Sequence, residues 1–186
     1  MSEKVGEPPR QANFFHVCGN CPISCCVGAR PPVTSKRKAI INNYLKATGL
    51  SIEKAFEETG RYTFPRETEG NQCVFMDHNT KKCRIHPVKP ETCVAGPITF
   101  DINTKTEKIE WFLKTEKICP LAGALNRNKS LLQNHFESAR RELLRLVQDL
   151  DSVALRAVLK IEEPDTFKIG EEGLNFEVLA KLKLFS

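Results

Sequence analysis

The chain has 186 residues with eight cysteines, and its formal net charge is +5. A chain of this length can bury a hydrophobic core without covalent help, so eight cysteines are not needed to hold a small fold together. Residues 1–13 are polar and contain prolines, and no stretch of the chain has the length and apolarity of a leader or a membrane span. We therefore expect a flexible tail at residues 1–13 and a cytoplasmic protein with reduced thiols.

The positive charge does not indicate a nucleic-acid partner. It counts the cysteines as neutral, whereas metal-bound cysteines are thiolates. Two centres, each with four thiolates around a core of charge +2, would each carry about −2 and bring the +5 to about +1. Lysines and arginines are also interspersed with acidic residues along the chain. We expect neither nucleic acid nor membrane as a partner, and we expect a protein partner.

The predicted ordered part begins with a loop of four cysteines within residues 14–32. A helix follows, capped by Thr34 or Ser35 and ended by Gly49, because apolar residues recur on one face. That face carries Ile40, Ile41, Tyr44 and Leu45. Residues 51–60 are predicted to form a second, short helix. The two helices would make one wall beside the cysteine loop.

Short strands are predicted next. Residues 62–65 suit an edge strand, since Pro65 has no N–H to give to a ladder. Gln72–Met76 is a second candidate strand, and Asp77–Lys82 forms the turn after it.

Apolar residues alternate with polar ones in residues 98–102 and again in residues 109–113. This pattern, with residues 103–108 between the two runs, predicts a β-hairpin. Cys93 precedes the hairpin and Cys119 follows it. Both thiols are therefore expected at the same end of the hairpin.

Three helices are predicted after residue 125. The longest covers residues 129–150, where apolar positions step by four and three: Leu132, Phe136, Ala139, Leu143, Leu146 and Leu150. A second helix begins at Asp151 and runs to Ile161, and a third covers residues 174–184. The predicted fold is a helix-rich α+β fold, with an irregular cysteine-rich metal cradle in residues 14–125 and an antiparallel helical cap in residues 126–186.

The spacing C-x2-C-x3-C-C, with four further cysteines in the next hundred residues, indicates metal binding. The candidate ligands are Cys18, Cys21, Cys25, Cys26, Cys73, Cys83, Cys93 and Cys119. Neighbours in an extended segment point to opposite sides, so Cys25 and Cys26 would serve two sites or line two sides of one. The first four and last four cysteines could form two closed sets, or the two groups could interleave.

The spacing favours iron–sulfur over zinc. Structural zinc sites usually consist of two knuckles with two ligands each, but only one C-x2-C is present and the later cysteines stand singly. Proline also follows Cys21 and Cys119, as is common at cluster ligands. We expect one or two 4Fe–4S clusters used in electron transfer or redox sensing, with a structural zinc module that docks a partner as the alternative.

Other side chains offer less chemistry. His16 and His86 lie close to cysteines in the sequence and are additional candidates for a ligand or a hydrogen bond. The sequence contains no Ser/His/Asp arrangement and no phosphate-binding glycine loop, so we predict no catalytic residue.

Together these residues resemble the YkgJ-type cysteine-cluster family, which carries a CxxCxxxCC zinc- or iron-chelating domain. The resemblance covers residues 14–123 and rests on Cys18–Cys26, Cys73-Val-Phe-Met, Cys83-Arg-Ile-His-Pro-Val-Lys-Pro-Glu-Thr-Cys93 and Cys119-Pro120. The family often has Tyr where His86 stands and Arg where Val94 stands. Some relatives are called lysine N-methylases, which would imply S-adenosylmethionine as a cofactor, but no methyl-donor loop accompanies the cysteines here.

Overall fold

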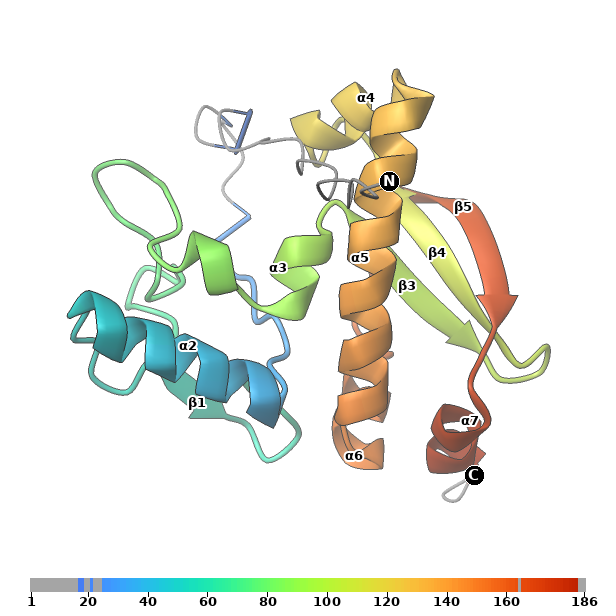
Figure 1. Ribbon diagram of the computed structural model, residues 1–186, viewed down its shortest axis with the longest axis horizontal. Helices are drawn as coiled ribbons and strands as arrows, with labels where there is room; N and C mark the ends of the chain where they lie inside the picture. Colours follow the sequence, from blue (N-terminus) through green and yellow to red (C-terminus); the bar gives the residue numbers. More distant parts are fainter. Residues whose placement is uncertain (1–16, 19–20, 22–24, 164, 184–186) are drawn as a thin grey trace, which may run out of the picture.

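A computed structural model describes residues 17–18, 21, 25–163 and 165–183, and shows an α+β fold (Figure 1). The predicted tail at residues 1–13 and the candidate His16 lie outside the described residues. None of the helices within the described ranges combines the length and the apolar composition that crossing a membrane requires.

The first predicted helix is confirmed as α2, Ser35–Thr48. The Thr34 hydroxyl accepts a hydrogen bond from the Arg37 N–H at 3.1 Å, and Gly49 ends the helix at φ 68°, a conformation that favours glycine. Ile41 is buried as predicted, but Ile40 is 47% exposed because it lies toward the solvent side of the helix.

The predicted helix at residues 51–60 is wrong. The chain instead forms strand β1, Phe56–Glu58, which pairs antiparallel with β2, Thr63–Pro65. Isolated helices of ten residues are marginal, so pairing with a neighbouring strand prevails over the local helical pattern. The strand expected at residues 62–65 is confirmed. The described residues 51–60 contain no helix, so the expected wall of two helices is not formed.

Residues 72–83 form a turn-rich loop in which strand pairing is limited to isolated bridges. The candidate strand Gln72–Met76 is therefore wrong, because the chain turns back when the Met76 N–H donates to the Cys73 carbonyl at 2.9 Å. The predicted turn after it is confirmed: the Asp77 carboxylate accepts the Thr80 N–H at 2.7 Å.

The predicted hairpin is confirmed as β3, Ile98–Asn103, and β4, Lys108–Lys114. A third strand, β5, Thr166–Gly173, pairs antiparallel with β4 and gives the sheet order β3-β4-β5. The expectation that residues 126–186 contain only helices is therefore corrected. This strand pairs with the open edge of β4 through backbone hydrogen bonds, and the apolar pattern of its own residues does not predict that pairing.

Short helices join these parts. They are the 3-10 helix η1, His86–Val88, the helix α3, Glu91–Ala95, and the helix α4, Pro120–Asn126. The C-terminal part has three helices in the described residues, which are α5, Lys129–Asp149, α6, Ser152–Val158, and α7, Phe176–Lys183. The long helix predicted at residues 129–150 is confirmed. The next helix begins as predicted, with the Asp151 carboxylate accepting the Ala154 N–H at 2.8 Å, but its last helical residue is Val158.

Two hydrophobic cores organise the molecule. The first core lies under α2 and comprises Val33, Ile41, Leu45, Ala55, Val74, Phe75 and Ile85. The second core lies between the three-stranded sheet and α5, α6 and α7, with Trp111, Leu143 and Leu155 among its buried residues. In Figure 1, α3 lies between these two halves, beside α5. Residues on both sides of position 125 thus share the second core.

Candidate metal centre

The eight candidate ligands come from four parts of the chain. Four belong to residues 18–26, and two flank the Asp77 turn. Cys93 lies in the middle of α3, and Cys119 is the N-cap of α4. Since α3 precedes β3 and α4 follows β4, these last two thiols lie at the same end of the hairpin, as predicted.

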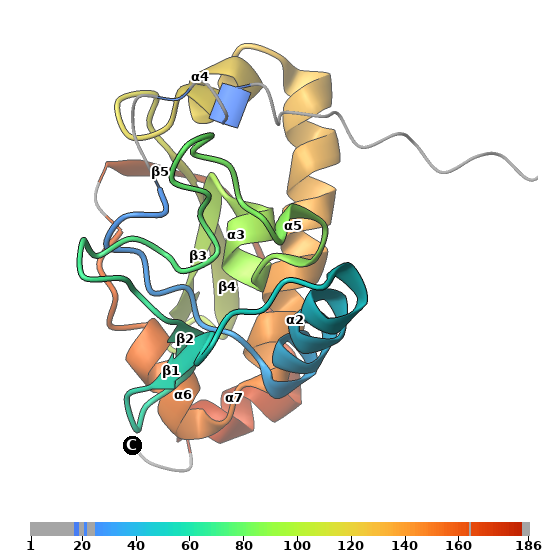
Figure 2. The same cartoon turned by 90° about the vertical axis from the view of Figure 1, so that its left-hand side faces the viewer.

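Backbone hydrogen bonds fasten the first cysteine segment to the loop after β2. The Cys73 N–H donates to the Cys26 carbonyl at 2.7 Å, and the Gly28 N–H donates to the Asn71 carbonyl at 2.7 Å. A single β-bridge between Val27 and Gln72 lies between these bonds. Figure 2 shows the segment from residue 25 running beside the loops that follow β2. Cys26 and Cys73 are thereby held next to each other although 47 positions separate them in the numbering.

Three sulfurs accept hydrogen bonds from backbone N–H groups just after them in the chain. Phe75 donates to Cys73 and Ile85 donates to Cys83, each from two residues further on. Cys119 accepts from both Ala122 and Leu121 in the first turn of α4. Such donors stabilise the thiolate form that metals bind.

These amide donors were missed in the sequence, although a signal exists. An apolar residue stands two positions after each of the three cysteines, in Cys73-Val-Phe, Cys83-Arg-Ile and Cys119-Pro-Leu. The buried apolar side chain fixes the tight turn that aims its own N–H at the sulfur.

Cys25 and Cys26 share a hydrogen bond, so their sulfurs meet instead of pointing to opposite sides. The expectation of opposite sides assumed an extended segment, but Cys25 lies in a turn. The shared bond lowers the pKa of Cys25 to about 6 and raises the pKa of Cys26, because the two thiols hold one proton between them.

The charge on Cys25 reaches cysteines of every segment. Burial is the largest cause that raises the pKa of five other thiols, and Cys25 raises each of them further: Cys18, Cys73, Cys83, Cys93 and Cys119. The pKa of Cys73 rises to about 11. Like charges couple in this way only at short range, so thiols of both predicted sets lie around one region of the fold.

Lys89 is a cation that faces this group of thiols. Burial is the largest influence on Cys83 and Cys93 and raises the pKa of both thiols, whereas the Lys89 ammonium lowers the pKa of both. Lys89 follows η1 in the chain and is partly buried. A neighbouring ammonium favours the thiolate over the thiol, and the sequence alone did not single this lysine out.

The donor set suits a soft metal. As whole residues, Cys18, Cys25 and Cys93 are exposed, although burial raises the pKa of the Cys18 and Cys93 thiols. Cysteines of all four segments are present as thiols, among them Cys18, Cys73, Cys93 and Cys119. Within the described residues, no three Cys, His, Asp or Glu side chains stand at ligand distance from one point. The fit to zinc or iron–sulfur thus rests on the chemistry of the sulfurs.

His86 lies three residues after Cys83, and the backbone N–H of His86 donates to the Cys83 carbonyl at 3.2 Å. Burial, together with Lys89, lowers the pKa of His86, so its imidazole is neutral at pH 7. His86 therefore remains a candidate nitrogen donor beside the thiols.

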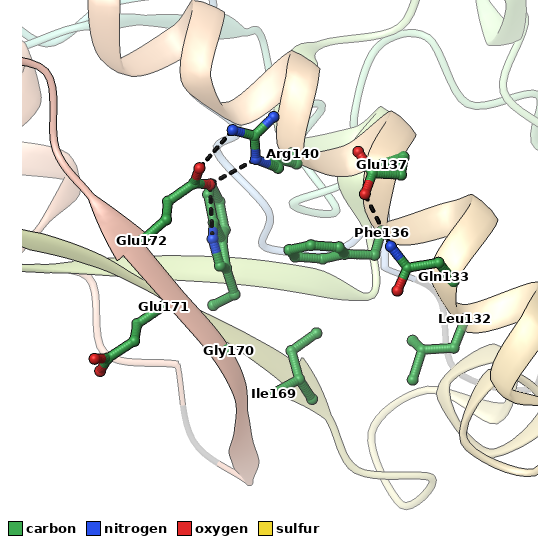
Figure 3. Close-up of a pocket in the computed structure, with 10 residues that line it drawn as sticks. Leu132, Gln133, Phe136, Glu137, Arg140, Ile169, Gly170, Glu171 and Glu172 are labelled. Atoms are coloured by element: carbon green, nitrogen blue, oxygen red, sulfur yellow. Dashed lines mark hydrogen bonds and ion pairs between the residues drawn. The ribbon is translucent and has the colours of Figure 1, made fainter.

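A separate pocket of about 260 Å³ lies between α5 and β5, away from the cysteine segments (Figure 3). Glu172 on β5 accepts hydrogen bonds from the Trp111 indole at 3.1 Å and from Arg140 Nε at 2.6 Å. The Phe136 ring meets the Trp111 ring edge-on with centroids 5.7 Å apart. These contacts hold β5 against α5, and the sequence could not predict the pocket because β5 itself was not predicted.

Comparison with known proteins connects this arrangement to a family. Residues 17–120 match the family profile CxxCxxCC, described as "putative zinc- or iron-chelating domain". An uncharacterized protein of Methanocaldococcus jannaschii is 32% identical to this chain over 102 residues, which cover 52% of this chain and 54% of that protein. No solved structure matches the chain.

Proposed function

This chain belongs to the CxxCxxCC family, described as zinc- or iron-chelating, and from that premise we propose that its cysteines hold an iron–sulfur cluster used in electron transfer or redox sensing. The observation that carries the proposal is the set of backbone N–H groups aimed at the sulfurs of Cys73, Cys83 and Cys119. Hydrogen bonds to ligand sulfurs tune the reduction potential of such clusters.

The cluster, when bound, would supply one-electron chemistry. The residues of the chain then have two tasks, which are to hold the thiolates and to set the charge around them. The backbone amides perform the first by stabilising each thiolate, and Lys89 performs the second by offsetting negative charge near Cys83 and Cys93. A centre that passes electrons needs no substrate pocket, so the partner would be another protein.

The spacing of the ligands also favours a cluster over zinc. Cys93 and Cys119 stand singly on two different short helices, at the two chain ends of one hairpin. A zinc knuckle takes two ligands from one tight turn, whereas clusters accept thiolates that are scattered along the chain.

Visible spectroscopy of protein purified without oxygen tests the proposal. A brown protein with acid-labile sulfide, whose absorption bleaches on addition of dithionite, would support it. Colourless protein with stoichiometric zinc would contradict it and would indicate a structural module that docks a partner. Calorimetry with S-adenosylmethionine adds a further check, since stoichiometric binding would favour a methyl-transferring enzyme over an electron carrier.

A further inference from the structure

The candidate ligands are divided between the two hydrophobic cores. Cys73 and Cys83 pack against the first core, under α2. Cys119 packs against the second core, and α3, which carries Cys93, contacts α5. A metal centre that takes thiols from both groups therefore has to cross the junction between the two halves of the molecule, which Figure 1 shows on either side of α3.

Four polar residues connect the halves at this junction. The hydroxyl of Thr34, just before α2, donates a hydrogen bond to Glu91 Oε1 at 2.7 Å. Arg37 on α2 has its Nε 3.8 Å from the same Glu91 oxygen and forms an ion pair with Glu142 on α5. We call Thr34, Arg37, Glu91 and Glu142 the junction cluster. One guanidinium thus lies between carboxylates from two different helices.

The junction cluster is removed from water. Thr34 and Glu91 are each 3% exposed, and within the described residues Glu91 Oε2 has no hydrogen-bond partner although it is buried. Withdrawing a carboxylate from water is costly unless an opposite charge accompanies it. Arg37 supplies that charge only while α2, α3 and α5 stay in their present positions. The cluster therefore fixes a geometry more than it adds stability.

The cluster also lies next to a candidate ligand. Glu91 is the first residue of α3, and Cys93 follows two positions later on the same short helix. Any movement of Glu91 away from Arg37 would shift the start of α3 and with it the sulfur of Cys93. The position of this thiol relative to Cys73 and Cys83 is consequently set at the junction.

We propose that Arg37 is a positioning residue for the metal centre: it holds α2, α3 and α5 together so that thiols of the two halves meet, and filling of the centre in turn holds the junction closed. This inference rests on the metal binding in the proposed function, and it does not depend on whether the metal is iron or zinc. Because the two events are linked, each must strengthen the other by the same factor.

Two neighbouring variants on α2 test the first half of the proposal. Arg37→Gln removes the charge between Glu91 and Glu142. The matched control, Lys36→Gln, removes a bond from Lys36 to Asp149 on α5 at 2.7 Å, but that lysine side chain is 78% exposed. Chelator competition measures the metal affinity of each.

We expect Arg37→Gln to weaken metal binding by about 10-fold or more, as removal of supporting partners commonly does. We expect Lys36→Gln to stay within about twofold of the unchanged protein, since exposed pairs contribute little. Arg37→Lys should lie between them, because an ammonium cannot contact two carboxylates in the way a guanidinium does. Equal affinities for Arg37→Gln and Lys36→Gln would overturn the proposal.

Hydrogen exchange on the unchanged protein tests the second half and needs no variant to fold. Metal loading should slow amide exchange in residues 34–38 and 91–95 more than in the β3–β4 turn at residues 103–108. Slowing around Cys73, Cys83 and Cys119 with none in residues 34–38, which contain no cysteine, would overturn this inference and leave the metal centre standing. A protein that binds no metal at all would overturn both.

Discussion

At the scale of single residues, the charge balance around the thiols depends on Lys89. Lys89 lowers the pKa of Cys83 and Cys93 against the effect of burial, and it also opposes the negative charge of Cys25. A cation beside an anionic centre stabilises the form with more negative charge, which is the reduced form of a cluster.

Replacing Lys89 by methionine should therefore lower the reduction potential of the loaded protein, because the methyl thioether keeps bulk and removes charge. Lys105→Met is the control, since Lys105 lies exposed in the β3–β4 turn. Redox titration followed by visible absorption gives both potentials. A potential that rises in Lys89→Met, or an equal change in both variants, would contradict the role assigned to Lys89.

His135 provides a residue-scale test through pH. Its Nε2 lies 3.1 Å from the carbonyl oxygens of Ala95 and Gly96, at the end of α3. Burial lowers the pKa of His135 below its ordinary value of 6.5, with the two carbonyls opposing the shift and Lys89 adding to it. The folded protein thus binds this proton less readily than the unfolded chain. The neutral His135 therefore makes its full contribution to the free energy of unfolding above pH 6.5, and this contribution declines as the pH falls below that value.

The free energy of unfolding should therefore fall more between about pH 8 and about pH 5.5 in the unchanged protein than in His135→Gln. Denaturant titration of both proteins in the same metal state measures the difference. Identical pH dependence in the two proteins would show that His135 does not carry this effect.

The residues of the candidate site could be predicted in part. The eight thiols stay a prediction, drawn from the C-x2-C-x3-C-C spacing and the single cysteines after it, because clustered thiolates bind soft metals whatever the fold. The role of Lys89 and the bond between Cys25 and Cys26 could not be predicted. Both depend on how close groups come in space, which spacing along the chain does not give.

At the scale of elements, β5 completes the sheet through Glu172. This carboxylate accepts bonds from Trp111 and Arg140, and the Trp111 side chain is almost entirely buried. Figure 3 shows the Glu172 side chain turned toward Arg140, while the neighbouring Glu171 side chain points away from Arg140. Glu171 instead pairs with Lys108 and Lys168 on the solvent side.

Glu172→Ala should destabilise the fold by about 1–3 kcal/mol, because the buried indole N–H loses its acceptor. Glu171→Ala should cost clearly less, since its pairs are open to solvent. Thermal or chemical unfolding compares the two variants. A larger loss in Glu171→Ala would contradict the contact pattern that holds β5 on α5.

Elements with strong local patterns were predicted and those that depend on distant partners were not. The capped helix α2, the alternating hairpin and the long α5 are confirmed, since each carries its own periodicity. Residues 56–58 and 166–173 form strands only because β2 and β4 offer them edges. The segment Thr166–Gly173 has just two large apolar residues, Phe167 and Ile169, so nothing local marks it as a strand.

At the scale of the whole molecule, the candidate ligands are divided between the two hydrophobic cores. The first core holds Cys73 and Cys83, and the second holds Cys119 beside the hairpin. A metal bound by both sets would add its binding free energy to the contact between the halves. The C-terminal region shares the second core with the hairpin, and Cys119 packs against that core.

The metal content of anaerobically purified protein, measured by elemental analysis beside that of a Cys93→Ser variant, tests the central claim most directly. Cys93 lies on α3, two residues after Glu91 of the junction cluster. We predict iron bound in the unchanged protein and most of it lost from the variant. Neither iron nor zinc in the unchanged protein, with its thiols free or paired as disulfides, would contradict the account.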